Sequence, residues 1–135
     1  MSVARRILWV LTVTYWLAIF YATHRPLSPT LPPGVTDKHA HFLAYMGLGF
    51  LVGSTLLLTV PRARRLLPVW VVLVAAGYGA FDEVTQAFVR RTPDVNDWLA
   101  DCAGAAVGAG VIWLVQLLAP RPAALTNDDA PVTSP

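Results

Sequence analysis

Three observations predict an all-α fold, a polytopic bundle of four transmembrane helices. Of the 135 residues, 56% are hydrophobic and 13% are charged, about half the roughly 25% charge of a soluble domain. The mean hydropathy is +0.55, and the sequence contains four apolar runs, each of which is expected to belong to a helix that crosses the bilayer. Five Trp and four Tyr suit a bilayer interface, where amphipathic rings lie at headgroup level. The length fits a single domain.

Charge and cysteine content exclude two other classes. The net charge of +2 is too small, and the Arg residues are too scattered between apolar runs, for a nucleic-acid-binding protein. The single cysteine, Cys102, excludes an intramolecular disulfide and a multi-cysteine zinc site. Cys102 lies in an apolar run without a basic neighbour, so we interpret it as a small buried thiol.

The first apolar run, residues 7–22, follows Arg5 and Arg6. A charged start and an apolar stretch also describe a signal peptide, which needs small residues one and three positions before its cleavage site. Cleavage after Ala22 would put Phe20 at the second of these positions. We therefore expect an uncleaved first transmembrane helix.

The second helix is expected to begin at Thr36 and Asp37, because either side chain can cap its free N–H groups. The preceding segment, residues 24–36, contains four prolines and a glycine and is predicted to be a loop, with His24 as a solvated side chain. Residues 42–60 carry no charge and approximate one bilayer crossing. Gly49 and Gly53 are four positions apart, which permits close contact with another helix.

The third apolar run follows a short basic turn at residues 61–65. It begins at Leu66 and must continue through Asp82 and Glu83 to about Val89 to span the bilayer. Residues 90–97 contain a proline and turn-prone residues, so we expect a connection there.

The fourth helix is predicted from about Trp98 to Ala119. Ala100, Gly104 and Gly108 form one row of small residues along it, a packing face for another helix. We expect residues 1–119 to form the transmembrane domain. Residues 120–135, rich in Pro, Ala, Thr and Asp, are expected to be a disordered tail.

Four crossings leave both termini on one side of the membrane. Cytoplasmic termini would place six basic residues inside and four outside, and the Arg-rich turn at 61–65 is the short loop that counts most. We therefore predict cytoplasmic termini. The loops at 24–38 and 90–97 then share the outer face, where the polar starts of the second and fourth helices meet the polar end of the third.

This convergence defines a candidate site. Asp37, His41 and Tyr45 are spaced four apart and share one helix face, with Lys38 three positions before His41. His39 and His41 are two apart, so they point to different faces. The ten candidate residues are Asp37, Lys38, His41, Tyr45, Asp82, Glu83, Gln86, Arg91, Asp97 and Asp101.

The two adjacent acids of the third helix diverge by about 100° around its axis. Only one is therefore expected to point into the bundle. We favour Glu83, because Gly79 and Gln86 lie on its side of the helix. Asp82 is expected to contact Arg90, Arg91 or a neighbouring helix.

These residues resemble two signatures of the VanZ-like membrane protein family. The first is Asp37-Lys38-x-x-His41-Phe42-x-x-Tyr45, and the second is Asp82-Glu83-x-x-Gln86-x-Phe88 followed by Arg91, Asp97, Gly104 and Gly108. The resemblance spans about residues 37–108, with one departure at Asp101, where the family often has Asn. It implies a small multi-pass protein of the bacterial inner membrane. The family's namesake is linked to reduced susceptibility to the glycopeptide antibiotic teicoplanin, so we expect a role in that susceptibility or in cell-envelope homeostasis.

The chemistry of the cluster has three interpretations. It is a buried ion-pair scaffold that fixes the helices, or a binding site for an envelope ligand, or a catalytic site. For a binding site, a cell-wall lipid precursor and the glycopeptide itself both fit a pocket with Lys38, Arg91 and His41 beside acids. The oligomeric state stays open.

Catalysis would use His41 as a base oriented by Glu83 or Asp37. The sequence contains no metalloprotease, nucleophile-elbow or phosphate-loop motif, which disfavours an enzyme. Since His39 and His41 point to different faces, we expect no metal, and we expect no cofactor. The alternative function is a membrane-embedded enzyme acting on an envelope lipid.

Overall fold

The computed structural model describes residues 2–25 and 32–119. Four long helices follow one another: α1 (Val3–Thr23), α2 (Asp37–Thr59), α3 (Leu67–Gln86) and α4 (Val95–Leu118). Two short 3₁₀ helices, η1 (Pro61–Leu66) and η2 (Ala87–Val89), precede and follow α3. All secondary structure in the described ranges is helical, which confirms the all-α fold. Part of the predicted 24–36 loop and the predicted tail at 120–135 lie outside the described residues.

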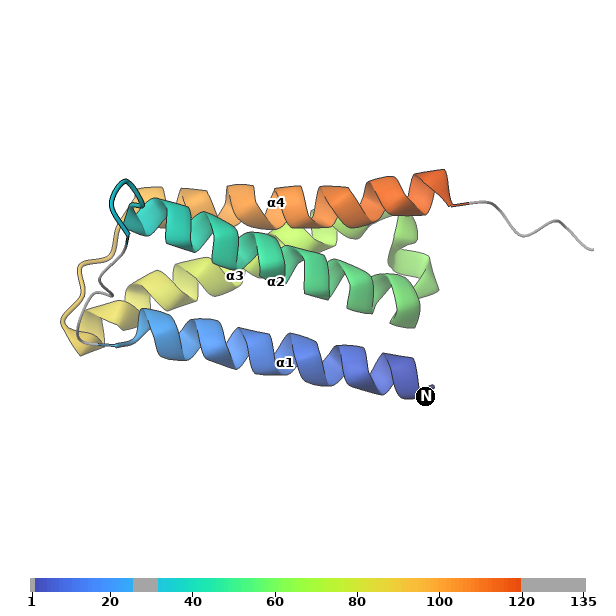
Figure 1. The fold of residues 1–135 in the computed structure, drawn as a ribbon, viewed down its shortest axis with the longest axis horizontal. Coiled ribbons are helices and arrows are strands. Elements are labelled where there is room, and N and C mark those ends of the chain that lie inside the picture. Colours follow the sequence, from blue (N-terminus) through green and yellow to red (C-terminus); the bar gives the residue numbers. More distant parts are fainter. Residues whose placement is uncertain (1, 26–31, 120–135) are drawn as a thin grey trace, which may run out of the picture.

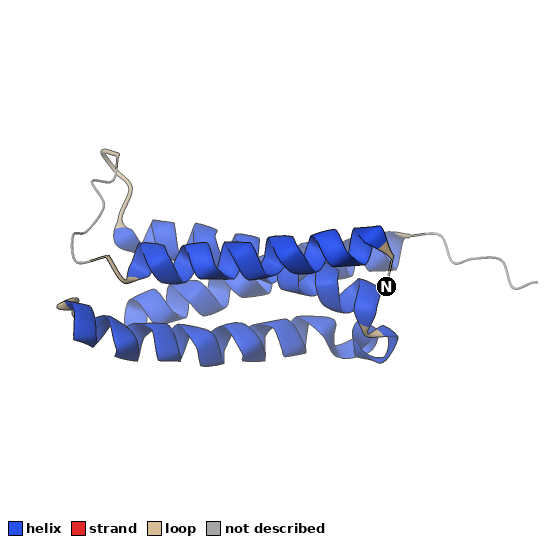
Figure 2. Ribbon diagram, turned by 90° about the horizontal axis from the view of Figure 1, so that it is seen from below, coloured by secondary structure: helices blue, strands red, loops and turns tan. Residues whose placement is uncertain are grey.

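The four helices run alongside one another along the long axis of the molecule (Figures 1 and 2). The start of α1 and the end of α4 lie at one end of the bundle (Figure 1). At the opposite end α1 and α3 finish and α2 and α4 begin; we call it the polar end. The starts of α2 and α4 therefore meet the end of α3 as predicted, and the end of α1 joins them.

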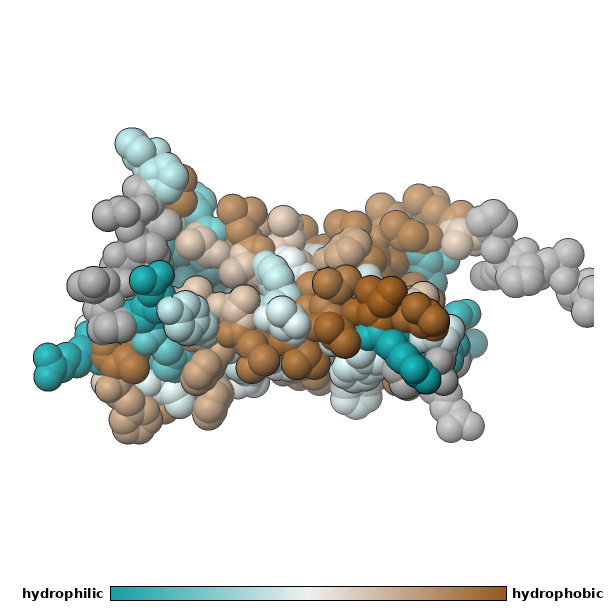
Figure 3. Space-filling model, turned by 60° about the horizontal axis from the view of Figure 1, so that its bottom comes forward, coloured by the Kyte–Doolittle hydropathy of each residue, from teal (hydrophilic) through white to brown (hydrophobic). Residues whose placement is uncertain are grey.

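The outer surface of the bundle is apolar. Each of the four helical stretches is long and apolar enough to cross a membrane. Large hydrophobic side chains point outward along them, among them Leu17, Leu73 and Leu114. On the face in Figure 3, hydrophobic residues cover most of the length of the bundle and hydrophilic residues gather toward its ends. An apolar exterior of this kind suits lipid, where every backbone polar group must be satisfied inside a helix.

Polar residues define where α2 and α4 begin. Thr36 caps α2 as predicted, and its backbone N–H donates to Nδ1 of His39 at 3.1 Å. Asp94 caps α4, where its Oδ1 accepts from the backbone N–H of Asn96 at 2.8 Å. The predicted start of α4 at Trp98 is therefore wrong: the helix begins at Val95, because the Asp94 cap satisfies a free N–H of the first turn.

Small residues bring α2 and α4 into backbone contact. A Cβ atom added to Gly104 would meet the carbonyl of Phe42, and one added to Gly108 would meet the carbonyl of Met46. On the opposing helix, a Cβ at Gly49 would meet the backbone of Ala105. Helices in lipid gain little from the hydrophobic effect, so close packing of this kind stabilises their association. The predicted glycine faces are confirmed.

Helix α1 packs mainly on α2 and contacts α3 less. The buried hydroxyls of Thr12 and Thr55 share a hydrogen bond of 2.9 Å between α1 and α2. Nearer the polar end, the Tyr15 hydroxyl donates to the Ala44 carbonyl at 3.1 Å. The core between α2, α3 and α4 is filled by residues such as Tyr45, which is fully buried.

Candidate functional site

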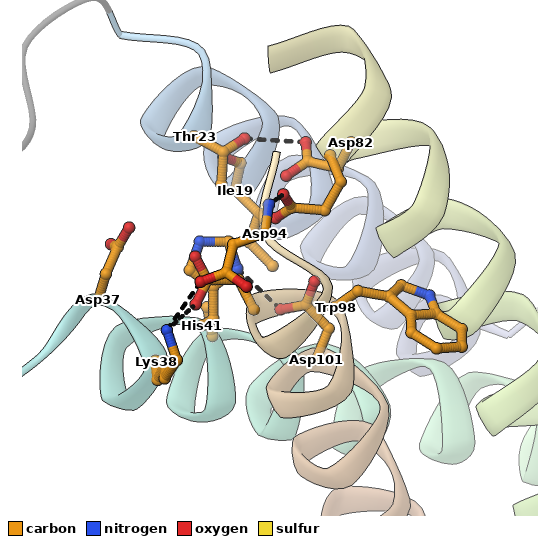
Figure 4. A network of polar contacts seen from close by, with 12 residues as sticks. Ile19, Thr23, Asp37, Lys38, His41, Asp82, Asp94, Trp98 and Asp101 are labelled. Carbon is orange, nitrogen blue, oxygen red and sulfur yellow. Dashed lines mark hydrogen bonds and ion pairs between the residues drawn. The ribbon is translucent and has the colours of Figure 1, made fainter. Parts of the chain in front are cut away.

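The outer layer of the polar end consists of ion pairs that join different helices. Nζ of Lys38 lies 3.0 Å from Oδ2 of Asp94 and 3.3 Å from Oδ1 of Asp97, so α2 is tied to the start of α4. Figure 4 shows Lys38 pointing toward Asp94. Lys38 thus contacts acids of α4 rather than pairing with His41 on its own helix.

Arg91 makes a second set of polar contacts between helices, which connects α2 to α1. Its Nη2 lies 2.7 Å from Oδ2 of Asp37, and its Nη1 donates to the backbone carbonyl of Thr23 at 3.0 Å. The Arg91 side chain is largely buried, whereas Asp37 is 40% exposed. The outer layer therefore closes the polar end around the last turn of α1.

A buried inner layer lies beneath these ion pairs. Asp82 and Asp101 are fully buried, and Glu83 and His41 are nearly so. His41 Nδ1 lies 2.9 Å from Oδ1 of Asp101 on α4. Gln86 Nε2 donates to Oδ2 of Asp82 at 3.0 Å.

The expectation that only one of the two adjacent acids faces inward is wrong. Glu83 Oε2 accepts from the backbone N–H of Asp94 at 2.8 Å, and Asp82 Oδ1 accepts from the hydroxyl of Thr23 at 2.9 Å. The end of α3 lies between α1 and the start of α4, so Asp82 faces α1 and Glu83 faces the start of α4. Asp82 contacts a neighbouring helix, as one of its expected alternatives stated.

Sequence reasoning missed the contribution of α1. His24 was expected to be a solvated loop side chain, yet it is only 13% exposed. Its Nδ1 lies 3.6 Å from Oδ1 of Asp82, and its Nε2 lies 2.9 Å from Oγ1 of Thr85. Finding this contact would require the register between α1 and α3, and no pattern in either segment encodes that register.

Within the described residues, Lys and Arg form ion pairs only with the outer acids. Lys38 and Arg91 bind Asp94, Asp97 and Asp37, whereas in the described ranges Asp82 and Asp101 have histidines as their only nearby basic groups. The ion-pair scaffold therefore accounts for the outer layer. It leaves the inner carboxylates without a Lys or Arg partner.

A cavity of about 260 Å³ lies between α1 and α2 at the polar end. Its walls are mostly apolar and include Ala18 and Ile19 of α1 and Ala44 of α2. Its polar lining residues are Tyr15, Thr23, Asp37, His41, Tyr45 and Arg91. Three of the predicted site residues on α2 therefore line one cavity, together with Arg91. Of the other predicted residues, Lys38 and Asp97 lie in the outer layer, and Asp82, Glu83, Gln86 and Asp101 lie in the inner one.

Asp94, which forms an outer ion pair with Lys38, precedes α4, and its contacts change the pKa of its carboxyl group. The backbone N–H of Asn96 and then the Lys38 ammonium lower the pKa of Asp94 to about 2 from its ordinary value of 3.8. Asp94 is therefore ionised at neutral pH and able to cap α4 and bind Lys38 at once.

Comparison with known families identifies one match. Residues 3–116 match the family model described as VanZ/LLP1. Neither the search of curated proteins nor the search of solved structures gave a match. The matched region covers α1, α2, α3, all but the last two residues of α4, and every candidate site residue.

Proposed function

The chain belongs to the VanZ/LLP1 family of membrane proteins, and from this premise we propose that it binds an amphiphile of the cell envelope at its polar end. It is a multi-pass membrane protein, with four helices long and apolar enough to span a bilayer. We assign it to the bacterial inner membrane and to cell-envelope homeostasis. Altered susceptibility to teicoplanin-type glycopeptides would be the phenotype.

The cavity between α1 and α2 is the observation that supports this proposal. Its volume of about 260 Å³ is near the lower end of the roughly 300–1,000 Å³ typical of small-molecule sites. Apolar walls with a few polar groups at one end match a molecule with a headgroup and a hydrocarbon chain. The cavity is too small for a whole glycopeptide or a whole lipid precursor, so it would hold only part of either molecule. We favour a cell-wall lipid precursor, because part of a hydrocarbon chain matches the apolar walls and the rest of the chain can lie in the bilayer.

The proposal places the polar end on the outer side of the membrane, with both chain termini in the cytoplasm. The basic residues of the η1 region support this orientation through the positive-inside tendency. The ligand would then reach the cavity from the outer leaflet, with its headgroup near Arg91 and His41 and its chain along Ala18 and Ala44.

Filling the cavity tests the binding function. Ala18→Phe should narrow it, since Ala18 lies on its wall. Cells producing this variant should lose any change in teicoplanin susceptibility that the wild-type chain confers, and the purified variant in nanodiscs should bind a short-chain cell-wall lipid precursor at least about tenfold more weakly, a change of about 1.4 kcal/mol.

Leu17→Phe is the matched control, because Leu17 adjoins Ala18 but is 64% exposed on the outer surface. It should bind the precursor as the wild type does. Equal binding by both variants would reject the cavity as the site. Binding of teicoplanin, but not of the precursor, would replace the favoured ligand with the antibiotic.

A second candidate function is catalysis on the same lipid. The supporting observation is the His41–Asp101 hydrogen bond, in which an acid orients a histidine that lines the cavity. The sequence predicted Glu83 or Asp37, rather than Asp101, as the acid that orients His41. Lipid extracts of cells with the wild-type chain should then contain a modified envelope lipid that is missing with His41→Gln. An unchanged lipid profile would reject the enzyme.

A further inference from the structure

We propose that the inner layer of the polar end is a binding site for one divalent transition-metal ion, with His41, Glu83 and Asp101 as its ligands. The three side chains come from α2, α3 and α4, so the ion would join three helices at one point. This assignment differs from the sequence expectation of no metal. It does not depend on the proposed lipid ligand.

The distribution of charge is the first argument. Glu83 and Asp101 are buried within the bundle, and the described Lys and Arg residues that form ion pairs bind other acids. Carboxylates at membrane depth normally pair with cations or line a functional site. Asp82 lies beside them and adds a further carboxylate. A divalent cation supplies the positive charge that this layer lacks.

An unpartnered oxygen is the second and independent argument. Oδ2 of Asp101 is fully buried and has no hydrogen-bond partner among the described residues, and the same holds for the Tyr45 hydroxyl. A Cβ atom added to Gly79 would lie 3.0 Å from this Oδ2. Gly79 is one helical turn before Glu83, so the free oxygen faces the surface of α3 that carries Glu83. Buried polar atoms without partners are rare, and a bound ion is one of the explanations for them.

The geometry suits a compact coordination sphere. One ligand atom from each of His41, Glu83 and Asp101 lies within 4.8 Å of the other two. Ligands of a tetrahedral ion with bonds of about 2.0–2.1 Å are about 3.3 Å apart. The three ligand atoms are therefore at most about 1.5 Å farther apart than a bound ion would require. Three protein ligands leave a coordination position free, as in catalytic zinc sites.

The ligand types select the class of metal. Imidazole nitrogen suits Zn²⁺, Fe²⁺ and other transition metals, whereas Mg²⁺ prefers oxygen ligands in an octahedron and keeps several waters. One nitrogen and two carboxylates, in a buried layer, favour Zn²⁺ or Mn²⁺. His41 also lines the cavity, so the free coordination position would be near the polar end of any molecule bound there.

Metal content measured on the purified full-length chain tests the assignment. The protein, isolated without a polyhistidine tag and stripped with a chelator, is dialysed against Zn²⁺, Mn²⁺ or Mg²⁺ and analysed by mass spectrometry. Wild type should retain about one Zn²⁺ or Mn²⁺ per chain and little Mg²⁺. Asp101→Asn and Glu83→Gln should each weaken retention by about a hundredfold or more, beyond the 10–100-fold typical of losing an outer-shell partner.

Two matched variants separate this site from its neighbours. Asp37 and Asp97 form an alternative group with His41, and Asp37→Asn should leave the metal content unchanged if the inner site is correct. Loss of metal in Asp37→Asn, with retention in Asp101→Asn, would overturn the assignment. His39→Gln, on the exposed side of the same helix turn, should also retain the ion.

A measurement on the wild type avoids dependence on variant folding. Bound Mn²⁺ should give an electron spin-echo spectrum modulated by the nitrogen of one imidazole. A chain that binds no Zn²⁺ or Mn²⁺ after stripping and dialysis, while the same sample retains its helical content and thermal transition, would reject the site.

Discussion

Arg91 and Asp37 lie 2.7 Å apart across the polar end, although they are 54 positions apart in the sequence. The same guanidinium donates to the carbonyl of Thr23. One side chain from the connection after α3 thus holds the last turn of α1 against the first turn of α2. These are the helices between which the cavity lies.

Replacing Arg91 should weaken the contact between the last turn of α1 and the first turn of α2. Arg91→Ala is expected to destabilise the folded chain by about 1–2 kcal/mol, because the part-buried carbonyl of Thr23 loses a charged donor. The coupling with Asp37→Ala in a double-mutant cycle should be about 1 kcal/mol or less, since Asp37 is 40% exposed and its ion pair is screened by water. Thermal unfolding in nanodiscs measures both quantities.

Arg90→Ala is the control for this prediction, because Arg90 adjoins Arg91 but is exposed. It should change the free energy of unfolding by no more than about 0.5 kcal/mol, as surface substitutions generally do. An equal loss of stability in both variants would contradict the closing role of Arg91.

Gly104 and Gly108 of α4 lie against the backbone of α2, and we call this contact the glycine seam. It predicts that two glycine-to-alanine substitutions on α4 differ in their effect on stability. A Cβ at Gly104 would meet the Phe42 carbonyl, so Gly104→Ala should push the helices apart and destabilise the fold by about 1–3 kcal/mol. A Cβ atom added to Gly110 would have nothing within 4 Å. Gly110→Ala should therefore be neutral, or stabilising by up to about 1 kcal/mol because alanine has the higher helix propensity. Chemical denaturation of the two purified variants compares them directly. Equal stability would show that the seam tolerates a methyl group.

Sequence reasoning succeeded where the signal is local or periodic. The uncharged runs located the four helices, the Thr36 and Asp37 pair located the start of α2, and the spacing of Gly104 and Gly108 located a packing face. Each of these follows from neighbours within a few turns of one helix. The face shared by Asp37, His41 and Tyr45 has the same origin, and these side chains do line one cavity.

The partners across helices could not be predicted. The contacts of Lys38 with Asp94, of His41 with Asp101 and of Thr23 with Asp82 depend on rotation and axial register between helices. Spacing along one helix indicates which face packs, but it does not specify which residue of the neighbouring helix lies opposite. For this reason His24 is only 13% exposed although the sequence predicts a solvated side chain. For the same reason Asp82 and Glu83 both face the interior, because the end of α3 lies between α1 and the start of α4.

The Asp94 cap predicts an acid-dependent loss of stability. The pKa of Asp94 is lowered to about 2 in the folded chain, chiefly by the backbone N–H of Asn96 and by Lys38. A lowered folded-state pKa means that its contribution is fully present above the ordinary value of 3.8 and is lost as the pH falls toward 2.

Asp94→Asn should remove this pH dependence between about pH 4 and pH 2, because Asn caps helices about as well but does not titrate. Asp94→Ala should lower the transition temperature at neutral pH, where the Asn variant keeps the cap and loses only the Lys38 ion pair. Thermal scans at several pH values measure both effects. A wild type and an Asn variant with parallel acid profiles would show that another group governs the response.

The orientation of the bundle predicts which end of the chain a membrane-impermeant thiol reagent reaches. In a Cys102→Ser background, Val95→Cys presents a thiol at the polar end, where Val95 is 65% exposed, and Ser2→Cys presents one at the opposite end, where Ser2 is also exposed. If the polar end faces outward, a charged maleimide should label Val95→Cys in intact cells and Ser2→Cys only after the membrane is permeabilised. The Cys102→Ser chain without an added cysteine gives the background, and labelling after permeabilisation confirms that each thiol is reactive. Labelling of Ser2→Cys alone in intact cells would invert the topology, and the polar end would then meet cytoplasmic ligands rather than those of the outer leaflet.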